Sequence, residues 1–335
     1  MMAAPCFAQF THVPITGEEI SKYEIFADGM SFRILDLESR EVALTDRHFK
    51  FHFNDFGSYA DLKEVPSSIE YENEIYKVVA IDIAPCVFSN ELSLPESIVE
   101  ISGCFENTEW TQFEFPKSLK NIGNGCFVEC GEIKEISLPQ ALRKIGDNSF
   151  RRNEKLEKVE FGTNLMSIGG NSFSNNPNLK SAVLPNSLVS VGSGAFDNCE
   201  KLEYVKLPRW LPYEYGSRGE TLKIFNGCRA IKVIEWESET PMGFPNCFDN
   251  VKKSECTVIV PDGFKDVYME NDYWKQFNIV EKSAYRAEVN EVPVSNNMTP
   301  SYYLLNGLHV TSEDNIESGR PYIKIEGDQH TKLIK

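Results

Sequence analysis

The feature that most constrains this chain is an internal repeat of about 23 residues. Each unit opens with an apolar residue, usually followed by proline, and the successive spacings are 21, 23, 23, 23 and 23 residues. The opening residues are Leu94, Phe115, Leu138, Phe161, Leu184 and Leu207. A unit this short cannot bury its own apolar face, so the copies have to stack on one another. The spacing therefore predicts a solenoid.

Further columns keep the same register and predict what each unit contains. Each unit ends in a run of the pattern Leu-x-x-Val-x-Leu, whose period-2 end predicts a short strand that stacking aligns into a parallel sheet. A glycine follows an isoleucine or valine in four units and predicts a tight turn with positive φ at Gly123, Gly146, Gly169 and Gly192. A recurrent phenylalanine predicts an aromatic column inside the solenoid. Its members are Phe105, Phe127, Phe150, Phe173 and Phe196.

The unit L-P-x-x-L-x-x-I-G-x-x-x-F-x-x-(N/C)-x-x-L-x-x-V-x-(L/F) resembles the BspA-like leucine-rich repeat over roughly residues 65–262. The resemblance implies a mostly β leucine-rich-repeat solenoid. It also implies a secreted or cell-surface protein of the kind made by gut and oral bacteria and some protists. Adhesion to host or bacterial surface proteins is the activity that the family suggests, and no enzymatic activity or cofactor is implied.

The flanks of the repeats predict caps and a separate C-terminal unit. Residues 1–64 are expected to hold an N-terminal region and a β-hairpin cap, and residues 65–282 the repeat array with its C-terminal cap. That cap is predicted as a strand at 256–261 followed by a helix near 264–277. A polar linker at 283–300 leads to a small β-rich module at 301–335, which resembles a degenerate secretion or sorting module.

Charge and hydropathy exclude two classes of partner. Lys and Arg number 34 and Asp and Glu 50, so the net charge is −16, which repels nucleic-acid phosphates and anionic membrane surfaces. No stretch of apolar residues is long enough for a transmembrane helix. Residues 1–9 lack a basic segment and an apolar core, so they are read either as the end of a truncated signal peptide or as a misassigned start. Secretion or surface display is therefore an expectation from the resemblance.

The cysteines and histidines do not predict a metal or catalytic site. Six of the nine cysteines fall on repeat columns, and no C-x-x-C pair occurs, so buried reduced thiols are expected rather than zinc or redox chemistry. These cysteines are Cys104, Cys126, Cys130, Cys199, Cys228 and Cys247. His48 and His52 share one face of an alternating segment with Lys50 between them, and no metal site is predicted there. No phosphate loop, nucleophile elbow or paired-carboxylate motif is present either, so no enzyme is predicted.

One interruption of the period predicts the binding site. Aligned phenylalanines lie 29 residues apart between Phe196 and Phe225, and the extra residues carry three aromatic side chains and two arginines on a loop. Outward strand positions beside the loop predict an exposed apolar patch. The candidate binding residues are Val183, Tyr204, Arg209, Trp210, Tyr213, Tyr215, Arg218 and Val233. The alternative is that Trp210 and Tyr213 pack back over the edge of the solenoid.

Taken together, these patterns predict a secreted or cell-surface binding module that acts in adhesion through protein–protein recognition. The alternative is a polysaccharide-binding component of a surface nutrient-capture system. The repeat describes the scaffold and not the ligand, so neither the ligand nor the oligomeric state follows from it.

Overall fold

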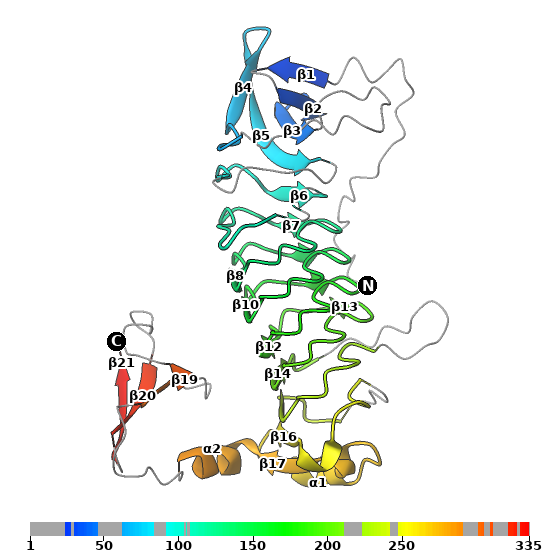
Figure 1. The fold of residues 1–335 in the computed structure, drawn as a ribbon, viewed down its shortest axis with the longest axis vertical. Coiled ribbons are helices and arrows are strands. Elements are labelled where there is room, and N and C mark those ends of the chain that lie inside the picture. The colour runs from blue at the N-terminus through cyan, green and yellow to red at the C-terminus, as the bar shows by residue number, and fades with distance from the viewer. Residues whose placement is uncertain are drawn as a thin grey trace.

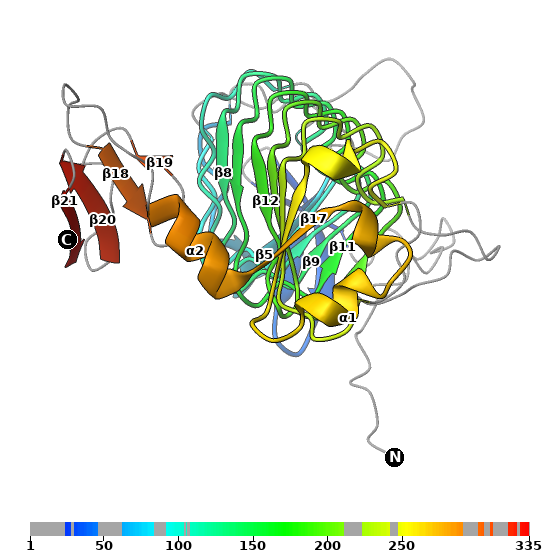
Figure 2. The same cartoon turned by 90° about the horizontal axis from the view of Figure 1, so that it is seen from below.

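The computed structural model describes residues 24–27, 30–45, 62–83, 92–103, 105, 108–210, 223–241, 247–290, 301–304, 309–310, 321–326 and 329–334. Its central part is the predicted solenoid, in which one turn stacks on the next along the long axis of the molecule (Figure 1). The solenoid strands lie on two sides of the stack (Figure 2): those on one side belong to a single sheet, and those on the other side are divided between two sheets.

The first sheet contains a two- or three-residue strand from each of five turns, each strand ending at or one residue after the recurrent isoleucine or valine. These strands are β6 (Glu100–Ser102), β7 (Asn121–Ile122), β9 (Lys144–Ile145), β11 (Ser167–Ile168) and β13 (Ser190–Val191). They pair in parallel and in chain order. The sequence analysis predicted a tight turn at the Ile-Gly and Val-Gly positions and no strand. The structure corrects that prediction, because the residues before these glycines pair as a sheet.

The strands on the second side of the solenoid are formed by the Val-x-Leu segments, as predicted. Its strands are β8 (Glu135–Ser137), β10 (Lys158–Glu160), β12 (Ser181–Val183), β14 (Tyr204–Leu207), β15 (Val233–Trp236), β16 (Thr257–Val260) and β17 (Asn278–Glu281). β8 pairs with β10, and β12 to β17 form a five-stranded sheet, all in parallel. Residues 112–116 of the preceding turn contain no strand, so the expected strand is missing from that unit.

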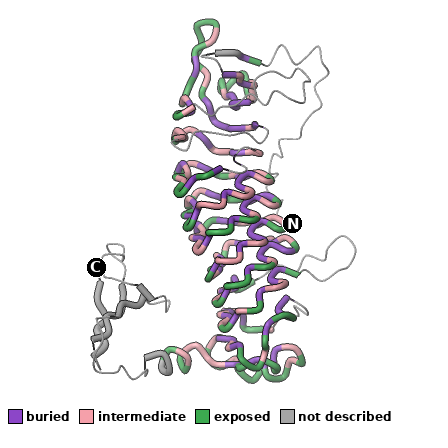
Figure 3. Tube along the Cα trace, viewed as in Figure 1, coloured by how far each residue is buried: buried purple, intermediate pink, exposed green. Residues whose placement is uncertain are grey.

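The phenylalanine column is confirmed. Phe105, Phe127, Phe150, Phe173, Phe196, Phe225 and Phe248 are all at most 1% exposed. Successive ring centroids lie 5.0–5.4 Å apart, and most of the rings are nearly parallel. The stack continues through the six-residue interruption, because Phe196 and Phe225 are 5.4 Å apart. Buried positions accordingly alternate with exposed ones in every turn (Figure 3).

The recurrent glycines are required for close approach and not for positive φ. A Cβ atom on Gly169 would lie 2.4 Å from the carbonyl carbon of Gly146, and one on Gly192 would lie 2.3 Å from the amide nitrogen of Gly170. Positive φ falls elsewhere in the unit. It occurs two residues before Phe105, Phe127, Phe150, Phe173 and Phe196, at glycine or asparagine, and also two residues after the phenylalanine in several turns. The prediction of positive φ at Gly123, Gly146, Gly169 and Gly192 is therefore wrong, although their close packing explains the column.

The N-terminal cap consists of hairpins, as predicted. β1 (Glu24–Ala27), β2 (Met30–Asp36) and β3 (Glu41–Thr45) are antiparallel, and so are β4 (Ser68–Tyr71) and β5 (Glu74–Asp82). β3 pairs with β5 in parallel, and β5 pairs in turn with β6. The cap thereby continues the first sheet and covers the end of the array.

The C-terminal cap differs from the prediction in its helices. The helix expected near 264–277 is divided into α1 (Lys265–Met269) and a 3-10 turn η3 (Trp274–Gln276), because the Asn271 side chain accepts the amide hydrogens of Tyr273 and Trp274 and starts a new turn. A second 3-10 turn, η2 (Lys253–Glu255), precedes β16. Residues 283–290, expected as linker, belong to helix α2 (Lys282–Asn290).

The last segment forms the β-rich unit expected at 301–335. Its strands are β18 (Ser301–Leu304), β19 (His309–Val310), β20 (Pro321–Glu326) and β21 (Gln329–Ile334). They pair antiparallel in the order β19-β18-β20-β21.

Candidate functional site

The column three residues after each phenylalanine holds the turns together from inside. Each side chain in it donates a hydrogen bond to the carbonyl oxygen of the phenylalanine in the preceding turn, at 2.9–3.2 Å. The donors are Cys130, Asn153, Asn176, Cys199 and Cys228. A thiol and a carboxamide are interchangeable here because both are small donors inside the array.

The cysteine prediction is confirmed for the five predicted positions that the structure describes, where the cysteines are reduced and buried. Cys104 lies outside the described residues. Cys256 is a sixth buried thiol, which the repeat columns did not reveal. Burial raises the pKa of Cys247 to about 11 and that of Cys256 to about 12, so neither is a thiolate at neutral pH.

The outward positions of the second sheet are more polar than expected. Register aligns Val183 with Lys206 and Glu235 in one column, and Tyr204 with Val233 in the other. Val183 is 39% exposed, whereas Tyr204 and Val233 are half-buried. The Tyr204 hydroxyl donates a hydrogen bond to Glu235 at 2.6 Å. These three predicted residues therefore do not form a continuous exposed apolar surface.

A charged cluster joins this sheet to helix α2. Lys206 contacts Glu235 at 3.1 Å and Glu237 at 3.2 Å, and Lys282 contacts the same carboxylates at 3.1 and 2.5 Å. Burial favours a raised pKa for Glu235, but the Tyr204 hydrogen bond and the two lysines outweigh it, and the pKa is lowered. The hydrogen bond from Lys282 lowers the pKa of Glu237. The cluster fixes the start of α2 on the array.

The interruption of the period begins at a well-anchored exposed residue. The Asn186 side chain accepts the Arg209 amide hydrogen at 2.8 Å, and the Arg209 guanidinium pairs with Glu239 at 2.5 Å. Trp210 follows directly and is 63% exposed. It does not pack back over the edge, so that alternative is wrong for Trp210. Tyr213, Tyr215 and Arg218 lie outside the described residues.

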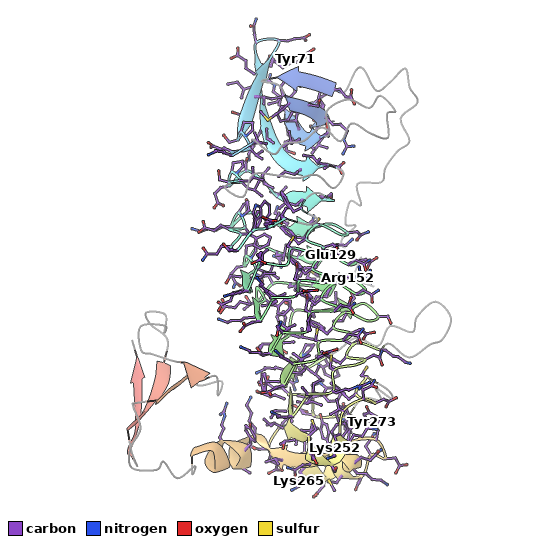
Figure 4. The ribbon with its side chains drawn as sticks, in the orientation of Figure 1. Tyr71, Glu129, Arg152, Lys252, Lys265 and Tyr273 are labelled. Carbon is purple, nitrogen blue, oxygen red and sulfur yellow. The ribbon has the colours of Figure 1, made fainter. Side chains whose placement is uncertain are left out.

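A polar groove that sequence reasoning missed crosses four consecutive turns. Its volume is about 760 Å³. Two columns of residues, two positions apart in each turn, line the groove, and we call them its first and second walls: Glu129, Arg152, Asn175 and Asn198 in the first, and Gly131, Glu154, Pro177 and Glu200 in the second. Figure 4 shows Glu129 and Arg152 side by side on neighbouring turns. We call this the four-turn groove.

The first wall of the groove has an unusual backbone conformation, which is the signal that could have revealed it. All four of its residues have φ between 58° and 60°. Asparagine two residues after the repeat phenylalanine, at Asn175 and Asn198, is typical of such a conformation. Glu129 and Arg152 occupy the same column, and neither residue type indicates a positive φ, so the sequence did not predict this wall.

Within the described part of the chain, no group of three or more His, Cys, Asp or Glu side chains is placed to hold a metal ion. His48 and His52 lie outside that part. A search of the same residues for helices finds none that is both long and apolar enough to cross a bilayer.

Parallel strands, stacked turns and an internal phenylalanine column define a solenoid of the leucine-rich-repeat class. Residues 98–213 match the BspA type leucine rich repeat region in six copies. This match agrees with the resemblance that the sequence pattern indicated.

Several solved structures are similar to the chain. The Treponema pallidum leucine-rich repeat protein is 23% identical, with 76% of this chain and 95% of that chain covered and a TM-score of 0.40. A leucine-rich repeat protein from Bacteroides ovatus is 18% identical, with 77% and 82% covered and a TM-score of 0.35. A leucine-rich cell surface protein from Faecalibacterium prausnitzii is 15% identical, with 79% and 97% covered and a TM-score of 0.29. No curated protein matches the chain.

Proposed function

We propose that this protein is a secreted or cell-surface module that binds host or bacterial surface proteins, and that the repeat turns within residues 65–282 are its binding unit. The observation that carries the proposal is Trp210. It is a large aromatic side chain, 63% exposed, and it follows a backbone position that Asn186 and Glu239 anchor through Arg209. Exposed tryptophan on a rigid scaffold is typical of protein-recognition surfaces.

Rigidity supports this role because it reduces the entropy lost on binding. The turn before the interruption is joined to its neighbours by strand pairing at β14 and by the Phe196 and Phe225 rings. A partner that covers Trp210 therefore meets a preformed surface. Arg209 beside it adds a planar donor to an otherwise acidic protein.

The test measures binding of the purified full chain to a panel of immobilised extracellular-matrix proteins and to bacterial and epithelial cells. For the tightest partner, Trp210→Ala should weaken affinity at least tenfold with an unchanged melting temperature. Ile75→Ala is the matched control, since Ile75 is 66% exposed and lies in the N-terminal cap. Unchanged affinity, a large fall in melting temperature, or no binding to any member of the panel would contradict the proposal.

A second function, polysaccharide capture, is supported by the four-turn groove. Its walls carry carboxylate, carboxamide and guanidinium groups, which are planar and hydrogen-bond well to neighbouring hydroxyl groups. A glycan array probed with the full chain tests this function. Affinity that survives Trp210→Ala would separate it from protein recognition.

A further inference from the structure

The four-turn groove is organised before any ligand arrives. The Arg152 guanidinium pairs with Glu129 at 2.8 Å, and the Asn198 side-chain amide donates to the Asn175 side-chain oxygen at 3.2 Å. The Asn175 amide in turn donates to Ser174 at 3.3 Å. Glu129 with Arg152, and Asn175 with Asn198, thus join neighbouring turns in pairs, which reduces the side-chain entropy that remains to be lost on binding.

The groove offers both donors and acceptors, with an excess of acidic groups. Glu129 and Arg152 neutralise one another across neighbouring turns. Glu154 and Glu200 of the second wall keep their negative charge in the groove, because Lys155 pairs with Glu132 and Lys201 bonds Asn178, both outside the lining. An anionic ligand is therefore disfavoured here. A neutral ligand rich in hydroxyl groups finds a hydrogen-bonding partner of either kind.

The spacing of the turns distinguishes between linear ligands. In these four turns the stacked phenylalanine rings are 5.0, 5.1 and 5.3 Å apart, so the wall repeats at nearly the same interval. An extended peptide presents side chains on one face about every 6.6 Å, and it falls out of step with the wall within three turns. A hexopyranose ring linked through opposite carbons is close in length to one turn.

We propose that the four-turn groove binds a linear, neutral polysaccharide that lies along the solenoid axis with one sugar ring at each turn. This inference rests on the second proposed function and adds the site, the orientation and the number of rings. The carboxylates of both walls accept hydrogen bonds from the ring hydroxyls, and the carboxamides of Asn175 and Asn198 on the first wall both accept and donate them. No bond is made or broken in the sugar.

The test is isothermal titration of the full chain with oligosaccharides of increasing length. The probes are tri-, tetra- and hexasaccharides of β-1,4-glucan, β-1,4-xylan and β-1,4-mannan. Affinity for the preferred sugar should rise at least tenfold between the tri- and tetrasaccharide and then change little, because the groove spans four turns. A continuous rise with length beyond four rings, or no binding of any probe, would overturn the proposal.

Variants locate the site. Asn198→Gly combined with Glu200→Gln removes an amide and a carboxylate while glycine retains the positive φ at position 198. Tetrasaccharide affinity should fall at least tenfold without a change in melting temperature. Glu203→Gln, an exposed glutamate outside the groove, is the control. If a glycan array gives binding that these variants leave intact, polysaccharide capture stands and the groove assignment is wrong.

Discussion

Removal of one ring from the phenylalanine stack tests whether the stack is the core of the array. Phe150 is 0% exposed, with Phe127 at 5.0 Å and Phe173 at 5.1 Å on its two sides, at interplanar angles of 4° and 9°. Phe150→Ala leaves a ring-sized cavity, and such substitutions cost about 3–5 kcal/mol. Two stacked pairs account for about 1–3 kcal/mol of this, at about 0.5–1.5 kcal/mol for each pair.

Urea unfolding followed by circular dichroism provides the free energies. Phe150→Leu keeps most of the buried volume and loses the stacking, so it should cost less than Phe150→Ala. The exposed residue Val189 gives a control in Val189→Ala, for which a change within about 0.5 kcal/mol is expected. Since each turn contacts only its neighbours, the alanine variant should also separate the unfolding of the two halves of the array and lower the m-value. A loss below about 1 kcal/mol for Phe150→Ala would refute the assignment of the ring to the core.

Three further predictions follow from interturn contacts. Gly169→Ala should lower the free energy of unfolding by about 1–3 kcal/mol, because the new Cβ meets backbone at 2.4 Å. Gly131→Ala, where a Cβ has nothing within 4 Å, should lower it far less. Equal melting temperatures for the two variants would contradict the close-approach explanation. Cys126, Cys130, Cys199, Cys228, Cys247 and Cys256 should resist alkylation in the native protein and react in denaturant, as mass spectrometry of labelled peptides would detect; labelling without denaturant would show that these thiols are accessible. A double-mutant cycle of Glu237→Gln and Lys282→Gln should give a coupling of about 0.5–1 kcal/mol. The pKa of Glu237 is lowered in the folded protein, so this coupling should be present above the ordinary glutamate pKa of about 4.3 and be lost as the pH falls through the lowered value. A coupling that persists in strong acid would exclude the ion pair.

Positions that depend on the repeat register could be predicted from the sequence. Stacking brings residue i next to residue i+23, so the Phe column, the Asn and Cys column and the Val-x-Leu strands need only the period to be placed. The same reasoning located the interruption of the repeat period, which follows Leu207 and adds residues to one turn. It also aligned Tyr204 with Val233, which the strand register bears out.

Properties that depend on which backbone and side-chain atoms meet were decided only by the tertiary structure. Gly169 is required because neighbouring turns approach more closely than a Cβ allows, and nothing local in the sequence distinguishes that reason from positive φ. The Tyr204 hydroxyl meets Glu235, which is 31 residues away, and the polar contact replaces the apolar patch that side-chain type alone suggested. Residues 283–290 read as linker because they are polar. In the fold they form a helix, whose first turn is held by Asp262 and by the Glu235 and Glu237 carboxylates. The period thus determined the scaffold, whereas the atomic contacts between turns determined which surfaces remain available to a ligand.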